Sequence, residues 1–246
     1  MEWKFETRMA NGKPYDRYEY DSAIRMKYST SKPEDFDLET RAWRAYQVEE
    51  VKKVLSKRSY LEHANRRAEA LDTLWTKERA DSATYGRNWG YYVGLENIRK
   101  YYVDGNPFGG AGTDVCHPFT TYKIIIADDN KTAQATWYSI GYEINPALSK
   151  DVDCYWDDQR CGADLVYEDG QWKIWHSRIF PVFRNDYFKD FAKAPEADLT
   201  ATKFRDGLED FHAFFRYTPD CVMPRSEPEI PLPYDTWEPG WNFGVD

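Results

Sequence analysis

His117 is the residue whose type and position best suit acid–base chemistry. It follows a loop at 106–112 that combines one proline with three glycines. It also begins a stretch from His117 to Ala127 that is rich in β-branched and aromatic residues, which predicts a strand. A neutral imidazole, with an ordinary pKa of about 6.5, accepts a proton at neutral pH. We therefore predict that His117 is a general base, the alternative being a histidine that caps the strand end by hydrogen bonding.

A helical pattern from Ala45 to Lys77 supplies the next candidates, because its apolar side chains recur at three- and four-residue spacings. One stripe of this helix would face the core: Leu61, Ala64, Ala68, Leu71 and Trp75. At about 100° per residue, Tyr60 and Asn65 lie at the edges of the stripe, whereas His63 points away from it. Glu62 lies about 60° beyond Asn65 by the same count. Polar groups at the edges of the stripe can reach an interior site. The alternative is that they are core residues whose hydrogen bonds are satisfied by neighbouring groups.

Aromatic side chains would form the walls of such a site. In a predicted strand from Thr132 to Ile144, Trp137 shares a face with Ser139 and Gly141. We predict that Trp137 and the helical Trp75 contact a substrate, with core packing as the alternative for both.

The last predicted strand, Gln171 to Phe183, carries two further candidates. A period of two places Trp172, Ile174, His176 and Arg178 on one face and Lys173, Trp175, Ser177 and Ile179 on the other. If the first face lines the interior, His176 and Arg178 bind an anionic or oxygen-rich substrate. If it faces outward, they are surface groups.

The elements that position these residues follow a helix-first, strands-later order, which predicts an α+β fold with a curved antiparallel sheet against the long helix. A short helix is predicted from Leu95 to Tyr102 and another strand from Arg160 to Glu168, with turns at 128–130 and 168–170. The stretch around Gly86, Gly90 and Gly94 is expected to be irregular.

We divide the chain into three parts: an N-terminal arm at 1–44, the α+β domain at 45–190, and a C-terminal region at 191–246. The last part predicts a helix from Leu199 to Phe215, followed by an arm rich in proline and aromatic residues. The arm is expected to pack on its own domain or on a sister subunit, with a mobile lid as the alternative.

Composition excludes several classes of protein. The 246 residues carry a net charge of −9 without a basic cluster, which argues against nucleic-acid binding. The longest aliphatic run, 124–127, is too short to cross a membrane, and the first residues lack the apolar core of a secretion signal, so a cytoplasmic protein is expected. Aromatic residues at 17% with a mean hydropathy of −0.81 suit a flat apolar ligand inside a polar exterior, or aromatic core packing alone.

No metal or cofactor is expected. The four cysteines form no C-x-x-C pair, and phosphate-loop and metalloprotease motifs do not occur. The acidic pairs Asp128-Asp129 and Asp157-Asp158 are expected to be solvated in turns rather than to perform paired-carboxylate chemistry.

Four segments of the chain, taken in order, resemble the SnoaL-like branch of the nuclear transport factor 2-like superfamily. They are RAEALDTLW at 67–75, GYYVGLENI at 90–98, TAQATW at 132–137 and YEDGQWKIWH at 167–176. The resemblance implies a cone-shaped α+β barrel whose helices close one face of a bent sheet over a deep pocket. It also implies a homo-oligomer, a dimer or a trimer.

In the dehydratase-like members of this superfamily, a strand histidine removes a proton, a helix aspartate orients it, and tyrosines assist the departing hydroxyl. The resemblance assigns these roles to His117, Asn65 and Tyr60. Asn65 departs from the pattern because an amide brings no negative charge to stabilise an imidazolium, and Glu62 is an open substitute. The leading hypothesis is a cofactor-free dehydratase-type lyase acting on a small cyclic, mostly apolar oxygenated substrate. The alternatives are an isomerase or cyclase and a non-catalytic binding or assembly module.

Overall fold

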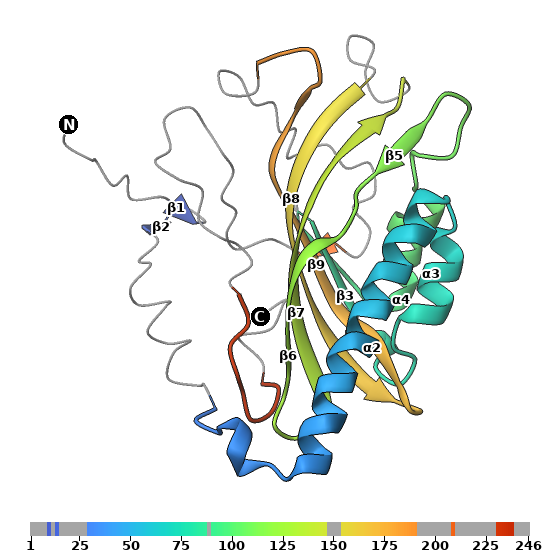
Figure 1. Ribbon diagram of the computed structural model, residues 1–246. Helices are drawn as coiled ribbons and strands as arrows, with labels where there is room; N and C mark the ends of the chain where they lie inside the picture. Colours follow the sequence, from blue (N-terminus) through green and yellow to red (C-terminus); the bar gives the residue numbers. More distant parts are fainter. Residues whose placement is uncertain are drawn as a thin grey trace, which may run out of the picture.

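The computed structural model describes residues 9–10, 13–14, 29–87, 90–146, 154–190, 208–209 and 230–238. A long helix, α2, packs with two shorter helices against one face of a strongly curved sheet (Figure 1). None of the described helices is both long and apolar enough to cross a membrane.

Helix α2 (Leu38–His63) begins at an N-cap, since the Asp37 carboxylate accepts a hydrogen bond of 2.7 Å from the Thr40 backbone N–H. The sequence predicted one helix from Ala45 to Lys77, but the structure has two. Asn65 adopts a left-handed conformation, φ 54°, which asparagine tolerates better than most residues, and the chain turns there into α3 (Arg67–Leu74).

The other helical segments are α4 (Leu95–Arg99), the π-helical turn η3 (Lys100–Asp104), and the short 3₁₀ turns η1 (Pro33–Asp35) and η2 (Ala80–Ser82). The predicted helix from Leu95 to Tyr102 therefore exists, with a π turn in its second half.

The main sheet has the strand order β10-β4-β3-β9-β8-β7-β5, and β6 also pairs with β7. Its strands are β3 (Thr84–Arg87), β4 (Gly90–Val93), β5 (Asp114–Cys116), β6 (Thr120–Ile126), β7 (Thr132–Ile144), β8 (Cys154–Glu168), β9 (Gln171–Asp186) and β10 (Leu208–Glu209). A separate two-stranded ribbon comprises β1 (Met9–Ala10) and β2 (Lys13–Pro14). The three long strands β7, β8 and β9 are antiparallel, as predicted.

Two strands were missed in the glycine-rich stretch, because β3 and β4 form a hairpin there. Gly86 permits close packing, since a Cβ at this position would lie 2.5 Å from the Tyr91 ring. Strand β3 pairs with β9 in the parallel direction. The predicted α+β fold, with a curved sheet packed against a long helix, is confirmed. The sheet is mixed and open, because the β3–β9 pair is parallel where an antiparallel sheet was predicted.

Strand β9 contains one extra residue near the start of its ladder with β8. Asp164 pairs with His176 and Leu165 pairs with Ile174, so Trp175 has no opposite residue. Residues that pair across strands share a face. Ile174 therefore faces the helices with Leu165, whereas His176 faces outward with Asp164. The predicted common face of Ile174 and His176 is wrong, because a bulge shifts the two-residue period.

A second extra residue, Val182, lies farther along β9. Between the two bulges, Ser177 faces the interior and Arg178 faces outward, so of the two alternatives for Arg178 the structure has the outer face and not the substrate-binding interior. Beyond Val182 the count shifts again, and Arg184 pairs with Asp157 on the inner face.

The core lies between the inner face of the sheet and the helices. Its most buried members are Val51, Leu55, Leu71, Trp75, Tyr102, Ala133, Ala135, Cys161, Leu165 and Ile174. Near the pairing of β5 with β7, the inner face of the sheet carries polar side chains instead, and those side chains form the site described below.

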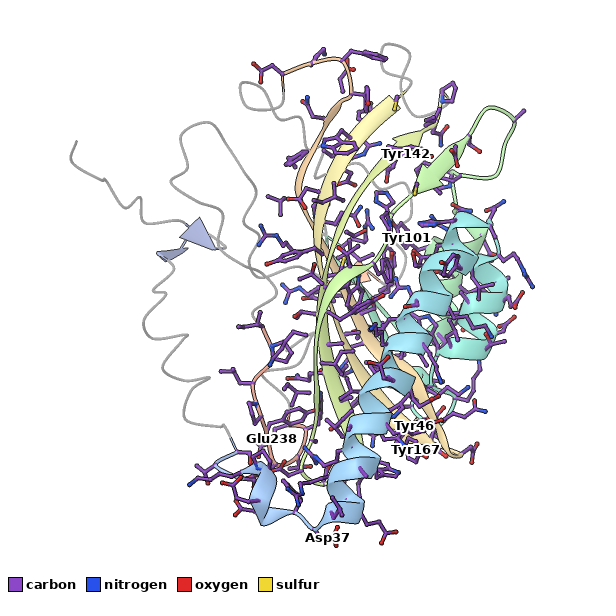
Figure 2. The ribbon with its side chains drawn as sticks, in the orientation of Figure 1. Asp37, Tyr46, Tyr101, Tyr142, Tyr167 and Glu238 are labelled. Atoms are coloured by element: carbon purple, nitrogen blue, oxygen red, sulfur yellow. The ribbon has the colours of Figure 1, made fainter. Side chains whose placement is uncertain are left out.

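Residues 230–238 lie along the other side of the 127–132 turn. The backbone N–H of Asp128 donates to the Tyr234 carbonyl, and that of Asp129 donates to the Asp235 carbonyl, both at 2.9 Å. Glu238 and the start of α2 at Asp37 lie at the same end of the molecule (Figure 2). The helix predicted from Leu199 to Phe215 lies outside the described residues.

Candidate active site

The backbone of His117 is fixed by helix α2 from both sides. Its N–H donates to His63 Nε2 at 2.7 Å, and its carbonyl accepts from Ser59 Oγ at 3.1 Å. His63 therefore contacts the backbone of His117 from a side of α2 that lies away from the core-facing stripe, which is the side that the sequence predicted for it. The connection between β5 and β6 passes over the end of α2 on a side that the core-facing stripe does not include.

The His117 ring pairs with a carboxylate that the sequence analysis did not select. His117 Nε2 lies 3.2 Å from Glu143 Oε1, and Arg184 donates to Glu143 Oε2 through Nε at 2.8 Å. Burial alone would raise the pKa of Glu143. The His117 hydrogen bond and the Arg184 guanidinium outweigh that effect and hold the pKa well below its usual range.

The ionised Glu143 fixes the tautomer of His117. A carboxylate can only accept, so Nε2 carries the proton and donates it, which leaves the lone pair of the neutral ring on Nδ1. Nδ1 is buried and has no hydrogen-bond partner among the described residues. Burial acts to lower the pKa of His117, but the hydrogen bond to Glu143 and the charge of Asp157 raise it overall. The ring is therefore a strengthened base with one acceptor atom available.

Asp157 completes this group from the neighbouring strand. It is fully buried, its Oδ2 accepts from Gln159 Nε2 at 2.6 Å, and its Oδ1 has no partner within the described part of the chain. Burial raises the pKa of Asp157 to about 6, with His117 opposing and Glu143 adding to the shift. The prediction that Asp157 and Asp158 are both solvated in a turn is wrong, because both lie on β8 and Asp157 faces inward.

Gly141 allows the histidine to approach this strand. A Cβ at this position would lie 1.8 Å from the Cys116 carbonyl oxygen and 2.9 Å from His117 Nδ1. No side chain fits there without moving the β5 backbone. Gly141 shares the inner face of β7 with Trp137 and Glu143, in the two-residue period that the sequence predicts.

The group also offers donor atoms for a metal. Ligand atoms of His117, Glu143 and Asp157 all lie within 4.8 Å of one another, and one imidazole with two carboxylates is a set that divalent metals accept. Arg184 already neutralises Glu143, and Arg87 interacts electrostatically with both carboxylates. A divalent cation would have to compete with these two guanidinium groups, so the charge balance favours an acid–base site over a metal centre.

A second polar group lies deeper in the interior, centred on Arg58 of α2. Arg58 Nε donates to Glu62 Oε1 at 2.7 Å, and the Tyr102 hydroxyl donates to the same oxygen at 2.5 Å. Burial would raise the pKa of Glu62, but the charges of Arg58 and Arg67 lower it overall, so the pair is ionised. Tyr101, which lies between the sheet and the helices in Figure 2, is near Arg87, between the two polar groups.

The helix residues predicted to assist His117 lie elsewhere. Tyr60 is 76% exposed, and the side-chain oxygen Oδ1 of Asn65 accepts from Asn106 Nδ2 at 2.7 Å in the loop beyond the helix. The structure does not bring either residue to the His117 ring, because α2 ends before Asn65 and Tyr60 lies on its solvent side. Glu143, a strand carboxylate, occupies the place next to the ring that the resemblance gave to a helix acid.

The predicted aromatic residues are interior. Trp75 is fully buried beside Tyr85, and Trp137 packs on Phe119 and Tyr122 with ring centroids 4.9 and 6.4 Å away. His176 lies on the outer face, where its Nδ1 is 2.8 Å from Asp164 Oδ2. Glu143 could have been found by extending the inner-face period of β7 by two residues. No local signal marks Arg184, because the bulges that set its direction leave no pattern in the sequence.

The sequence matches the SnoaL-like domain over residues 43–178. The chain belongs to this family. The four segments that carry the resemblance in the sequence all lie within the matched range, so the resemblance is confirmed. No functionally curated protein matches the sequence.

Several solved structures are similar in fold. One is a protein provisionally described as a scytalone dehydratase from Novosphingobium aromaticivorans, with 14% identity and a TM-score of 0.48, covering 64% of this chain and 97% of that one. Another is hexachlorocyclohexane dehydrochlorinase LinA-type3 from Novosphingobium barchaimii, with 12% identity, a TM-score of 0.46, and coverage of 65% and 96%. ActVI-ORFA from Streptomyces coelicolor has 15% identity, a TM-score of 0.44, and coverage of 55% and 96%. At these identities the likeness concerns the fold alone.

Proposed function

We propose that this SnoaL-like protein is a cofactor-independent lyase that removes the elements of water from a small cyclic, mostly apolar oxygenated molecule. The observation that supports this function is the buried chain from Arg184 through Glu143 to the His117 ring, which presents Nδ1 as an available base. The aromatic interior around Trp137 suits the flat apolar part of such a substrate.

In this mechanism, His117 Nδ1 removes a proton from a carbon next to a carbonyl group, and Glu143 stabilises the resulting imidazolium. The carbon–oxygen bond of the leaving hydroxyl then breaks, and the protonated Asp157 carboxyl supplies the proton that completes a water molecule. The electron pair of the broken carbon–hydrogen bond becomes the new double bond. A proton returning from His117 to Asp157, whose donor atoms lie within 4.8 Å, restores the starting state.

The reactive form holds one proton between His117 and Asp157. Asp157 has a pKa of about 6 and that of His117 is raised from its ordinary value, so the pair retains a single proton over a range near neutrality, mainly on His117. The reactive tautomer, with a neutral His117 and a protonated Asp157, forms when this proton moves to Asp157, whose ligand atom lies within 4.8 Å of that of His117. This arrangement meets the requirement of an elimination for one base and one acid in the same site.

Native mass spectrometry of the protein from its own host, followed by turnover of the bound molecule, tests the proposal. Wild type should convert the compound to a product that is lighter by about 18 mass units, because each turnover releases one water molecule. His117→Gln should reduce turnover by about 10²-fold or more, because it removes the base. His176→Gln is the matched control, since it alters an equally buried histidine that pairs with a carboxylate on the outer face. Unchanged ligand after incubation with wild type, or equal turnover by His117→Gln, would contradict the proposal and favour a binding module.

An isomerase is the second candidate, and the proximity of two proton carriers favours it. If Asp157 returned its proton to a different carbon of the substrate, the same two residues would move a double bond without a leaving group. The experiment above separates the two outcomes, because an isomerised product has an unchanged mass.

We also infer a homo-oligomer, a dimer or a trimer. Tyr138 and Ile140 are exposed two residues apart on the outer face of β7, and an exposed pair of large apolar side chains on a sheet face suits contact with a second copy. The same native spectrum reports the number of subunits.

A further inference from the structure

Arg58 is a fully buried cation that the proposed elimination does not use. Its guanidinium has three nitrogens, and two of them have partners. Nε donates to Glu62 Oε1 at 2.7 Å, and Nη1 donates to Ser177 Oγ at 2.6 Å. Nη2 is buried and has no hydrogen-bond partner among the residues that the structure describes. An unsatisfied charged donor in an interior is costly, so its retention calls for a function.

The surroundings of Arg58 offer aromatic rings and no described hydrogen-bond acceptor for the third nitrogen. Four aromatic rings enclose the guanidinium, with ring centroids 5.5 to 5.9 Å from its central carbon: Trp75, Tyr85, Tyr102 and Phe119. Ring faces attract a cation but accept no conventional hydrogen bond along the guanidinium plane. Glu62 is the carboxylate paired with Arg58, and it also accepts from Tyr102. An oxygen atom of a ligand could accept the remaining hydrogen bond from Nη2.

The neighbouring Ser177 supplies a second donor. Its oxygen accepts from Arg58 Nη1, which leaves its own hydroxyl hydrogen free to rotate toward a nearby acceptor. A guanidinium nitrogen with an adjacent hydroxyl is a common arrangement for holding the two oxygens of a carboxylate.

Arg58 is also joined to the proposed catalytic histidine through the backbone of α2. The next residue, Ser59, binds the His117 carbonyl at 3.1 Å, so one turn of the helix positions both groups. Arg87 lies between them, since it acts on Tyr85 at one side and on Glu143 and Asp157 at the other. A molecule held at Arg58 would therefore extend toward His117 through the aromatic interior.

We propose that Arg58 Nη2 and the Ser177 hydroxyl bind the carboxylate of the substrate, so that the ligands of this protein are cyclic or aromatic carboxylic acids. This inference rests on the proposed function in one respect, because the carboxylate belongs to the molecule on which His117 would act. The carboxylate fixes the ring among Trp75, Tyr85, Tyr102 and Phe119, with its far side toward His117.

Calorimetric titration with benzoate and with benzamide tests the site, since the two probes share size and shape and differ in charge. Wild type should bind benzoate at least about tenfold more tightly than benzamide, because a charged hydrogen bond in an interior is stronger than a neutral one. Arg58→Gln should abolish this preference. Ser177→Ala should weaken benzoate severalfold and change benzamide less. Arg44→Gln is the matched control, because Arg44 binds the turn at 126–130 instead.

Two results keep the test decisive if Arg58→Gln does not fold. The benzoate preference of wild type and its reduction in Ser177→Ala do not require that variant. Equal affinity of wild type for both probes, or binding of neither, overturns the proposal, and so does a benzoate preference that persists in a folded Arg58→Gln. A preference for benzoate without any lyase turnover would refute the proposed function and leave the carboxylate site intact, whereas turnover without the preference would do the reverse.

Discussion

Two buried histidine–carboxylate pairs lie on opposite faces of the same sheet. On the inner face, His117 Nε2 is 3.2 Å from Glu143, and on the outer face, His176 Nδ1 is 2.8 Å from Asp164. Both histidines are at most 9% exposed. By distance and burial alone the outer pair is the better dyad, so these two criteria do not identify an active site.

The surroundings of the two pairs differ. Charged groups accompany the inner pair, since Arg184 binds Glu143 and the Asp157 carboxyl lies within 4.8 Å of the donor atoms. The described hydrogen-bond and ring contacts of the outer pair are with an amide and aromatic rings. Gln134 donates to Asp164 at 2.9 Å, and the Trp237 ring from residues 230–238 packs on His176 with centroids 5.5 Å apart. A second titratable group distinguishes a site that can move a proton from one that holds a fold together.

The largest expected effect breaks the inner pair. Glu143→Gln removes the charge that stabilises the imidazolium, so turnover of the host-derived ligand should fall by about 10²-fold or more. Asp164→Asn makes the same chemical change in the outer pair and should alter turnover by less than about twofold, because that pair faces away from the interior. Steady-state kinetics of both variants measures the contrast, and equal losses would place the chemistry outside the inner pair.

A smaller effect concerns stability and pH at Asp157. Its folded pKa of about 6 lies above its ordinary value, so ionising this carboxyl disfavours the folded state, fully above about pH 6 and not at all below about pH 4. Asp157→Asn should therefore raise the free energy of unfolding at pH 8 by about 3 kcal/mol. The gain should vanish as the pH falls to about 4.

Urea unfolding of wild type and Asp157→Asn at several pH values measures this difference. Asp158→Asn, at the adjacent position of β8, is the control and should show less pH-dependent gain. If Asp157→Asn were less stable than wild type at pH 8, the ionised Asp157 would stabilise the folded state, and the prediction would be wrong.

The smallest effect removes the cover of the outer pair. Trp237→Ala deletes an indole that packs on Trp175 and His176, and it should lower the free energy of unfolding by about 1–2 kcal/mol. Turnover should stay near wild type, since the inner face is untouched. Denaturant unfolding and kinetics on the same sample check both parts, and a large loss of turnover in a folded variant would connect residues 230–238 to the chemistry.

Local patterns in the sequence predicted the parts of this fold that depend on neighbouring residues. The alternation in β7, the turns at 128–130 and 168–170, and the apolar spacing of α2 each appear where expected. The break at Asn65 and the hairpin of β3 and β4 were missed, because glycine-rich strands and a single left-handed residue carry little periodic signal.

The candidate site was predictable only in part. His117 was found because a lone histidine between a glycine-rich loop and a β-rich stretch can be recognised by its type, although the structure places it in the connection between β5 and β6. Its partners come from three strands, and Glu143, Asp157 and Arg184 meet only through the register of β7, β8 and β9. Register between distant strands is a tertiary property, so no window of sequence around any one of these residues reveals the group.

The two extra residues of β9 have a consequence for comparing this chain with its relatives. Trp175 and Val182 have no opposite residue on β8, so either could be absent from a related protein while every other side chain kept its face. An alignment must then place its gaps at these two positions. An ungapped alignment would match His176 or Arg184 to residues of the opposite face, and roles transferred from it would be assigned to the wrong side of the sheet.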